Sequence, residues 1–269
     1  MNHTGQDIDP HVVAITGASS GIGWELARKL AADGAHVALI ARRAERLSQL
    51  EAQITATGGV ARAFPCDLTD TAAIESLPDR IGEALGAPHV LVNNAGRGAH
   101  GAFEAVDLAT HHQVLTINLD SVIACTHAFV PQMLARGKGQ IVFVSSVLAR
   151  LPAPEHAVYA ASKWGVSGFA ESLSYELGPR GVEVVLVEPG LVRSEFAAQA
   201  STPLARYRRV PSKSSAQAAD EVHWAMRRNA RHHIADRVVA SLIGVKRHWP
   251  RFFRMIFAVA YRRVKRQQP

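Results

Sequence analysis

The chain has 269 residues, of which 48% are hydrophobic and 20% are charged. This composition supports one large folded domain and argues against a disordered chain. The net charge of +7 is unevenly distributed, because residues 202–269 hold 16 of the 30 Lys and Arg but only three of the 23 Asp and Glu. We therefore expect one local basic surface and no nucleic-acid partner.

The two cysteines, Cys66 and Cys125, are too few for a disulfide framework and have no metal-ligand spacing, so we expect no metal site. Both are expected to act as small apolar core residues. Residues 1–10 are expected to be a flexible N-terminus without a signal peptide. No uncharged apolar stretch reaches the roughly 20 residues that span a bilayer. These features predict a cytoplasmic protein.

Strand-like and helix-like segments alternate from residue 11 to about residue 190. The apolar strand-like runs are 12–15, 37–40, 61–64, 90–92, 141–144 and 182–187. The helix-like segments are 22–32, 43–57, about 70–85, 108–136 and 157–178. Continuous apolar strands that alternate with helices predict a doubly wound α/β domain, whose ligands bind beyond the carboxyl ends of the strands.

The pattern loosens after residue 194. Residues 194–215 contain Pro203, Pro211 and several Ser, and are expected to form a substrate loop or a short helical lid. Residues 216–230 have a helical pattern. We therefore divide the chain into a domain over residues 11–235 and an extension over residues 236–269.

A glycine-rich turn follows the first strand and opens the first helix, which is where a dinucleotide-binding turn is expected. Glycines at these positions let the backbone approach a pyrophosphate, and the helix N-terminus offers N–H groups to the phosphates. The cofactor-binding candidates in this turn are Gly17, Ser19, Ser20, Gly21, Ile22 and Gly23.

Two arginines, Arg42 and Arg43, follow the second strand. An acid at this strand end would bind the ribose 2′-hydroxyl of NAD, whereas an Arg would pair with the 2′-phosphate of NADP. The sequence therefore favours NADP(H) and leaves NAD(H) possible. The alternative is that both arginines are solvated residues of the next helix.

Further candidates follow the third and fourth strands. Asp67, followed by Leu68, could accept a hydrogen bond from an adenine amino group, or could serve as a helix cap or turn residue. Asn94 could bridge neighbouring strand backbones, and the small residues Ala95 and Gly96 would admit a cofactor ring or ribose.

These motifs recur together in a known family. The matching elements are Thr16-Gly17, Gly21-Ile22-Gly23, Asp67-Leu68, Asn93-Asn94-Ala95-Gly96, Asn118, Ser145-Ser146, Tyr159-Ala160-Ala161-Ser162-Lys163 and Pro189-Gly190. Over residues 11–194 the sequence resembles the single-domain branch of the short-chain dehydrogenase/reductase family. The resemblance implies a Rossmann-type fold with about seven parallel strands and a homodimer or homotetramer. It also implies hydride transfer between a nicotinamide cofactor and an alcohol or carbonyl substrate.

The resemblance makes Asn118, Ser146, Tyr159 and Lys163 the catalytic candidates. Tyr159 and Lys163 are four residues apart on a predicted helix and share one face. A free phenol has a pKa of about 10, and a neighbouring ammonium and the nicotinamide charge are expected to lower it. The family's Ser-to-Tyr spacing selects Ser146 rather than its neighbour Ser145 to hold the substrate oxygen. Asn118 is expected to connect to Lys163 through a water.

The turn after the sixth strand completes the expected cofactor site. Pro189 and Gly190 form the turn, and the backbone of Val192 and the hydroxyl of Ser194 are expected to meet the nicotinamide carboxamide. Tyr159 and Lys163 also count among the cofactor-binding residues. The histidines near the site, among them His111 and His156, are expected to be surface or rim groups.

Residues 246–266 hold eight Lys and Arg and no acid, around an apolar run from Phe252 to Tyr261. Basic flanks, bulky apolar residues and Trp249 fit a helix at a membrane interface with anionic lipids. Alternatively, the segment packs on its own domain or a second subunit, or covers an apolar substrate.

Three functions follow from these patterns. The first is an NADP(H)-dependent oxidoreductase of CH–OH groups with Tyr159 as general acid and base. The second is a membrane-surface reductase of a lipophilic acyl, steroid or retinoid-like substrate. The third is a non-catalytic NADP(H) sensor on the same fold.

Overall fold

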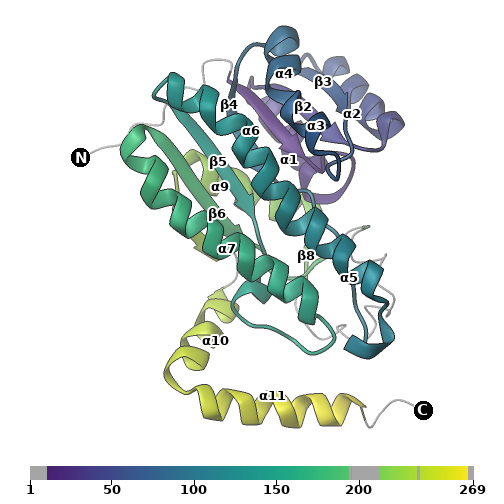
Figure 1. Cartoon of the computed structure of the whole chain (residues 1–269), viewed down its shortest axis with the longest axis vertical. Helices are drawn as coiled ribbons and strands as arrows, with labels where there is room; N and C mark the ends of the chain where they lie inside the picture. Colours follow the sequence, from purple (N-terminus) through teal and green to yellow (C-terminus); the bar gives the residue numbers. More distant parts are fainter. Residues whose placement is uncertain (1–10, 194, 196–211, 235–236, 266–269) are drawn as a thin grey trace.

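The structure is a computed structural model that describes residues 11–193, 195, 212–234 and 237–265 (Figure 1). Residues 1–10, Ser194 and most of the expected 194–215 loop lie outside the described residues. Within the described part, seven parallel strands form one sheet in the order β3-β2-β1-β4-β5-β6-β9. This arrangement confirms the predicted Rossmann-type α/β fold.

Two successive βαβ halves build the sheet. The first consists of β1 (Val12–Thr16), α1 (Gly21–Ala32), β2 (His36–Ala41), α2 (Ala44–Ala56) and β3 (Val60–Pro65). The second consists of α3 (Thr71–Glu75), α4 (Leu77–Leu85), β4 (Pro88–Asn93), α5 (Leu108–Leu115), α6 (Ser121–Ala135), β5 (Gly139–Val144), α7 (Ala157–Leu177), β6 (Val182–Glu188), α9 (Ser215–Arg227) and β9 (His232–Ile234). The chain order reverses between β1 and β4, which are neighbours in the sheet. Such a switch point is where open α/β sheets bind ligands.

The six apolar runs all form strands, as the sequence predicts. The seventh strand, β9, was not among the predicted elements, because His232–Ile234 is only three residues long and carries two histidines. The single helix expected over residues 70–85 is divided at Ser76 into α3 and α4. Pro78 stands in the first turn of α4, where a missing N–H costs nothing.

Both faces of the sheet are buried, since side chains alternate along each strand. Ile15 belongs to a cluster that includes Leu26 of α1, whereas Ala14 belongs to the opposite cluster, which includes Phe129 of α6. In Figure 1, α6 and α7 lie in front of the sheet and α1 and α9 lie behind it. Cys66 and Cys125 are buried, as expected.

One described helical stretch, Leu108–Ala135, has the length and apolar composition of a membrane span, with a mean hydropathy of 1.3. The sequence led us to expect no such stretch. Its residues Val122, Phe129 and Met133 are buried in the core against the sheet, so length and composition here fit a core helix.

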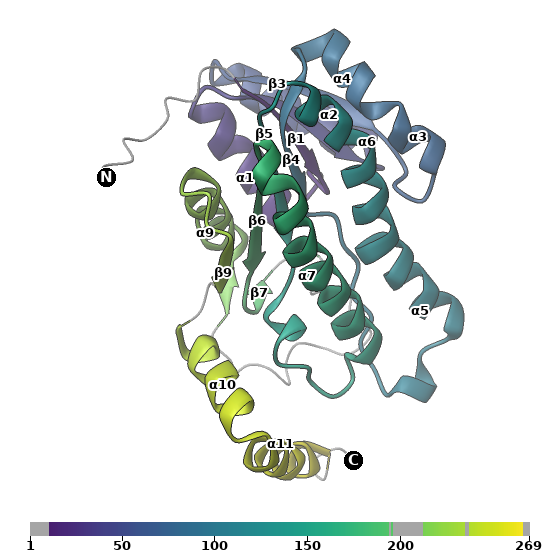
Figure 2. The same ribbon diagram turned by 60° about the vertical axis from the view of Figure 1, so that its left-hand side comes forward.

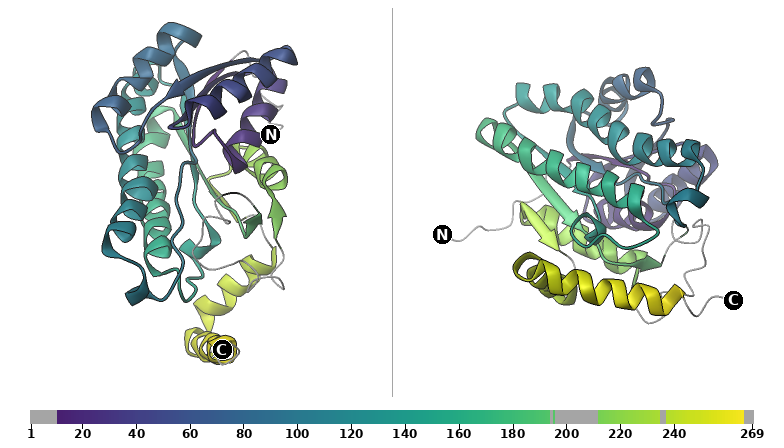
Figure 3. Two further views of the ribbon diagram at one scale, coloured as in Figure 1. Left: turned by 90° about the vertical axis from the view of Figure 1, so that its right-hand side faces the viewer. Right: turned by 60° about the horizontal axis from the view of Figure 1, so that its bottom comes forward.

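The C-terminal extension forms two helices, α10 (Arg237–His248) and α11 (Pro250–Lys265). They meet at a bend, and α11 runs apart from the body of the domain (Figures 2 and 3). Because α10 follows β9, which is parallel to β6, the extension begins at the same edge of the sheet where β5 and β6 end. This is the edge that carries the candidate site.

Candidate active site

The glycine turn between β1 and α1 has the geometry that the motif predicts. Gly17 and Gly21 have φ angles of 72° and 60°, in the left-handed region that favours glycine. A Cβ on Gly23 would lie 2.5 Å from the carbonyl oxygen of Gly17. Ser20 is the N-cap of α1 but makes no side-chain cap hydrogen bond, so it leaves the first N–H groups of this helix for another partner. This cradle fits the pyrophosphate of a dinucleotide.

Thr16 and Asn94 join the ends of β1 and β4 at the switch point. The Thr16 hydroxyl accepts hydrogen bonds from the N–H of Asn94 at 3.0 Å and of Ala95 at 3.1 Å. In return the Asn94 amide donates to the carbonyl of Thr16 at 2.9 Å. A Cβ on Gly17 would lie 2.8 Å from the Cα of Ala95, so the small residues allow this close contact. The bridging role predicted for Asn94 is therefore the one the structure has, and Gly96 follows it as an exposed residue.

A basic pair lies beside the glycine turn. The guanidinium of Arg43 donates to the Ser19 hydroxyl at 3.0 and 3.1 Å, and its other nitrogen is 3.0 Å from the carboxylate of Glu195. Arg46 donates to the carbonyl of Ser19 at 3.4 Å and lies 3.6 Å from the Glu195 carboxylate. The sequence did not identify Arg46, although it follows Arg43, the N-cap residue of α2, by three positions, a spacing that brings helix side chains together.

Arg42 faces a different partner. It is exposed, and its charge contributes to a lowered pKa of Asp67. The larger cause of that lowering is the hydrogen bond from the main-chain N–H of Thr69, at 3.0 Å. Asp67 therefore has the turn role that the sequence left open, and its exposed carboxylate remains beside the β3 end. Leu68 is buried and packs in the core.

Three catalytic candidates lie where β5 ends and α7 begins: Ser146, Tyr159 and Lys163. A hydrogen bond links the Ser146 and Tyr159 side chains. The Lys163 nitrogen lies 6.0 Å from the centre of the Tyr159 ring and donates to the carbonyl of Val144 at 3.0 Å. Ser145 instead bonds Ser167 and the carbonyl of Lys163, which supports the choice of Ser146 as the substrate-facing hydroxyl.

Burial controls the protonation of this pair in the cofactor-free protein. It raises the pKa of Tyr159 to about 12, against the lowering effect of the Ser146 hydrogen bond. Burial also lowers the pKa of Lys163 to about 8. In the protein alone the phenol pKa is therefore not lowered, because desolvation of the phenolate outweighs the Ser146 hydrogen bond. Lowering of this pKa by the nicotinamide charge stays a prediction.

Asn118 lies fully buried in a π-helical turn, Thr116–Asp120, between α5 and α6. Its oxygen accepts from the N–H of Arg97 at 2.7 Å, and its amide donates to the Arg97 carbonyl at 2.9 Å. The same amide donates to the Ser162 hydroxyl at 3.0 Å, which in turn donates to the Tyr159 carbonyl at 2.7 Å. Asn118 thus reaches α7 through Ser162 and the Tyr159 carbonyl, and its expected water-mediated link to Lys163 stays a prediction.

A buried carboxylate lies at the end of β6, next to the end of β5, and the sequence did not single it out. Glu188, the last residue of β6, is fully buried. It accepts hydrogen bonds from Arg150, Ser167 and His232, each at 2.9 Å. Burial raises its pKa, but the His232 hydrogen bond and the Arg150 charge outweigh this effect, so the net shift is a lowering. An acid at the end of an apolar strand, directly before Pro189, was the available signal.

The turn after β6 lies at the same edge. Pro189 is buried and its carbonyl accepts from the N–H of Val147 at 3.0 Å. Gly190 and the Val192 side chain are partly exposed, and Val192 lies in the short strand β7 (Val192–Arg193), which pairs with β8 (Lys213–Ser214). Ser194, the remaining candidate of this turn, lies outside the described residues.

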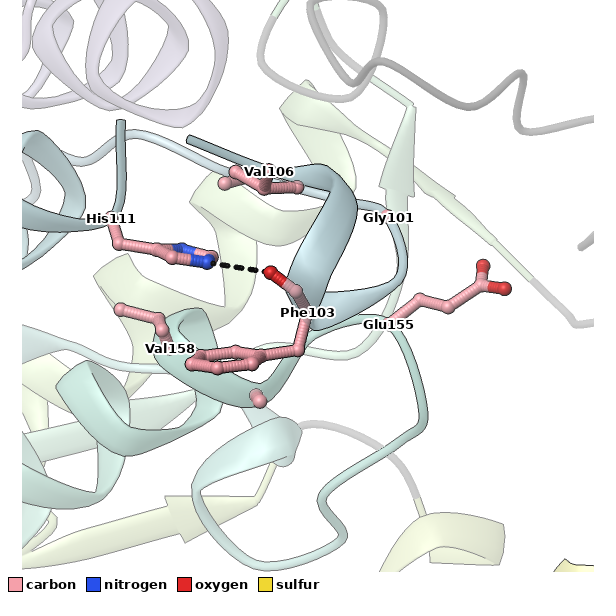
Figure 4. A pocket seen from close by; sticks show the side chains of 8 residues that line it. Gly101, Phe103, Val106, His111, Glu155 and Val158 are labelled. Atoms are coloured by element: carbon pink, nitrogen blue, oxygen red, sulfur yellow. Dashed lines mark hydrogen bonds between the residues drawn. The ribbon is translucent and has the colours of Figure 1, made fainter. Parts of the chain in front are cut away.

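His111 and His156 are buried, so their expected place at the surface or rim is wrong. Figure 4 shows the His111 ring stacked on Phe103, 5.1 Å between centres, with its Nε2–H donated to the Phe103 carbonyl. Phe103, His111 and Val158 line a cavity of about 30 Å³, which has room for a water molecule but not for a substrate. Burial lowers the pKa of His156, which favours the neutral ring. The centre of this ring lies 4.1 Å from the centre of the His100 ring.

The comparisons with known proteins agree with this geometry. The family model described as short chain dehydrogenase matches residues 11–204. A fatty acyl-CoA reductase from Acinetobacter baylyi is 35% identical over 223 residues, which cover 82% of this chain and 74% of that protein.

Solved structures match over most of the chain. A short-chain dehydrogenase from Sphingobium yanoikuyae in complex with NADPH is 28% identical, with a TM-score of 0.79, over 88% of this chain and 94% of that one. A short chain dehydrogenase/reductase from Burkholderia phymatum in complex with NAD is 25% identical, with a TM-score of 0.83. The match covers 90% of this chain and 94% of that one. The chain belongs to the short-chain dehydrogenase/reductase family of oxidoreductases.

Proposed function

We propose that this chain is an NADP(H)-preferring reductase that interconverts a carbonyl and a CH–OH group, with Tyr159 as general acid and base. The observation that carries the proposal is the hydrogen-bonded pair of Ser146 and Tyr159 beside the buried Lys163. This group lies at the same sheet edge as the glycine turn. The bound nicotinamide supplies or accepts the hydride.

Four side chains bind the substrate and the cofactor and transfer the proton. Ser146 holds the substrate oxygen, and the Tyr159 phenol gives that oxygen a proton during reduction or takes one during oxidation. The phenol is protonated at neutral pH because its pKa is raised to about 12, so it is ready to act as an acid. Lys163 binds the nicotinamide ribose, and Asn118 fixes α7 at Tyr159 and extends the proton path through water. For oxidation, a nearby positive charge must lower the phenol pKa.

The cofactor preference rests on Arg43, Arg46 and Ser19. Two guanidinium groups and a hydroxyl beside the end of β2 fit the 2′-phosphate of NADP(H). NAD(H) is the second choice, since solved relatives were found with NADPH and with NAD. The expected adenine contact of Asp67 and the nicotinamide contacts of Val192 and Ser194 belong to the same proposal.

The test is NADPH oxidation against aldehydes, ketones, 3-oxoacyl thioesters, steroids and quinones. Tyr159→Phe should lower turnover by about 10²- to 10⁴-fold, the usual contribution of a general acid, and should leave NADPH binding unchanged. Turnover retained in this variant would refute the role of Tyr159. NADPH binding by the wild-type protein without turnover of any carbonyl would favour the non-catalytic sensor.

A lipophilic substrate is the second candidate, favoured by the large exposed apolar side chains of α10 and α11. The similarity to a fatty acyl-CoA reductase supports an acyl-derived carbonyl. In this proposal residues 11–235 form the catalytic domain, residues 194–215 select the substrate, and residues 236–269 form the extension. The enzyme would then be cytoplasmic with peripheral membrane contact.

We also propose a homodimer or homotetramer. Ile123 on α6 and Tyr175 on α7 are exposed apolar side chains on the outer helical layer. Light scattering on the full chain tests the proposal, and a monomer at working concentration would contradict it.

A further inference from the structure

The outer face of α11 exposes large apolar side chains in one stripe. Phe252, Met255 and Val259 of α11 are 53%, 57% and 45% exposed. Trp249, the residue directly before α11, is 64% exposed, and its carbonyl accepts from the N–H of Phe253 at 3.0 Å, which continues the helical spacing. Their spacing of three, three and four residues places them within about one third of the helix circumference. The neighbouring Phe253 is only 8% exposed, and α11 packs against α10. We call these four residues the apolar stripe.

Positive charge accompanies the apolar stripe. Arg247, Arg251 and Arg254 are exposed along the α10–α11 unit. In sequence, residues 246–266 carry eight Lys and Arg and no acid. Two copies that paired through this surface would bring like charges together, which argues against self-association. An apolar stripe with cationic surroundings instead matches the interface of a bilayer that contains anionic lipids.

The extension contacts the domain next to the candidate active site. The Lys246 nitrogen donates to the carbonyl of Arg150 and lies 4.9 Å from the centre of the Trp164 ring. Arg150 follows Ser146 by four residues, and Trp164 donates to the carbonyl of Leu148 at 3.1 Å. The last turn of α10 therefore contacts both the segment that carries Ser146 and the helix that carries Tyr159 and Lys163.

We infer that α10 and α11 form a docking surface for anionic lipid bilayers, in which the apolar stripe enters the interfacial region. Because the extension starts at the carboxyl ends of the strands, docking places that edge of the domain toward the lipid (Figures 1 and 3). The substrate is then a lipophilic carbonyl that partitions into the membrane, such as a long-chain aldehyde. This choice of substrate rests on the proposed function, whereas the docking surface does not.

Vesicle co-sedimentation of the full chain tests the docking surface. We expect binding to vesicles of phosphatidylcholine mixed with phosphatidylglycerol, weaker binding to phosphatidylcholine alone, and loss of binding at high ionic strength. Trp249→Ser/Phe252→Ser should abolish sedimentation, and Trp224→Ser, an exposed tryptophan on α9, should not. Arg251→Gln/Arg254→Gln should weaken binding about 25-fold, at about fivefold for each charge, whereas the matched pair Arg227→Gln/Arg228→Gln should change it little.

Equal sedimentation of wild type and the Trp249→Ser/Phe252→Ser variant would overturn the proposal. The proposal would also be overturned if the wild type formed a dimer and bound no vesicles, and the variant were a monomer. The apolar stripe would then contact a second copy of the chain. Thermal unfolding confirms that each variant is folded. Turnover is measured separately on a water-soluble aldehyde and on a long-chain aldehyde in anionic vesicles. The variant should lose only the second activity; absence of both activities in wild type contradicts the proposed function and leaves the sedimentation result intact.

Discussion

Asn118 accepts a hydrogen bond from the N–H of Arg97 at 2.7 Å and donates one to the carbonyl of the same residue at 2.9 Å. One side chain thus satisfies both main-chain groups of the residue that follows the Asn-Ala-Gly segment after β4. The π-helical turn supports this contact, because it interrupts the regular helix where Asn118 must face the sheet edge.

Asn118→Ala should lower the free energy of unfolding by about 1–3 kcal/mol, since it leaves the part-buried main-chain groups of Arg97 and the buried Ser162 hydroxyl without their amide partner. It should also reduce turnover, because the support of Tyr159 through Ser162 is lost. Urea unfolding and steady-state kinetics measure the two effects. Gln113→Ala is the control, because its exposed amide also contacts Arg97 but only through the Arg97 side chain. Equal stability of the two variants would contradict the role of Asn118.

The sequence predicted six strands of the sheet because their apolar runs are continuous, and it predicted the glycine turn from residue type and context. It did not predict β9, whose three residues depend on pairing with β6. The partners of Glu188 come from residues 150, 167 and 232, and no local pattern joins positions so far apart. The pKa of Tyr159 also depends on burial, which only the packed fold defines.

Lys163 should make the cofactor-free protein more stable as the pH rises from about 8 to 10. Its pKa is lowered to about 8 by burial, against about 10.4 in an unfolded chain, so in this range the unfolded state binds more protons. Lys163→Met should therefore be more stable than wild type at pH 7, by about 1–3 kcal/mol after loss of the Val144 hydrogen bond, and the gap should narrow toward pH 10. Urea unfolding at both pH values measures the gap. A gap that is equal at both pH values would contradict the lowered pKa.

Arg43→Ala should weaken NADPH binding by about tenfold and leave NADH binding unchanged, because only NADPH carries the 2′-phosphate. Arg46→Ala should act in the same direction with a smaller effect, since its contact with Ser19 is longer. Isothermal titration with both cofactors measures the change. Arg62→Ala, an exposed arginine on β3 that pairs with Glu51, is the matched control. A parallel loss of NADH binding would show that Arg43 shapes the turn instead of reading the phosphate.

Glu195→Gln should strengthen NADPH binding by at most about fivefold, because its carboxylate pairs with Arg43 and Arg46 where the 2′-phosphate would bind. NADH binding should not change, since it needs no displacement of this ion pair. Weaker NADPH binding in the variant would mean that Glu195 orients the two arginines for the phosphate rather than competing with it.

Glu188→Gln should destabilise the protein by about 1–3 kcal/mol, because an amide cannot accept at both ends from Arg150, Ser167 and His232. The full penalty for an orphaned buried charge does not apply, since Arg150 and His232 keep 28% and 39% of their side chains exposed to water.

The effect of Glu188 on stability depends on pH. The pKa of Glu188 is lowered, so its stabilising effect is present above the pKa of an unfolded carboxyl and is lost as the pH falls through the folded value. The difference between wild type and variant should therefore shrink in acid. Glu183→Gln, an exposed acid on the same strand, is the control and should change stability by less than about 0.5 kcal/mol at any pH. Because Arg150 also anchors Lys246 of α10, Glu188→Gln should loosen the segment between Ser146 and the extension, and a larger fall in kcat than in cofactor affinity would locate the effect there.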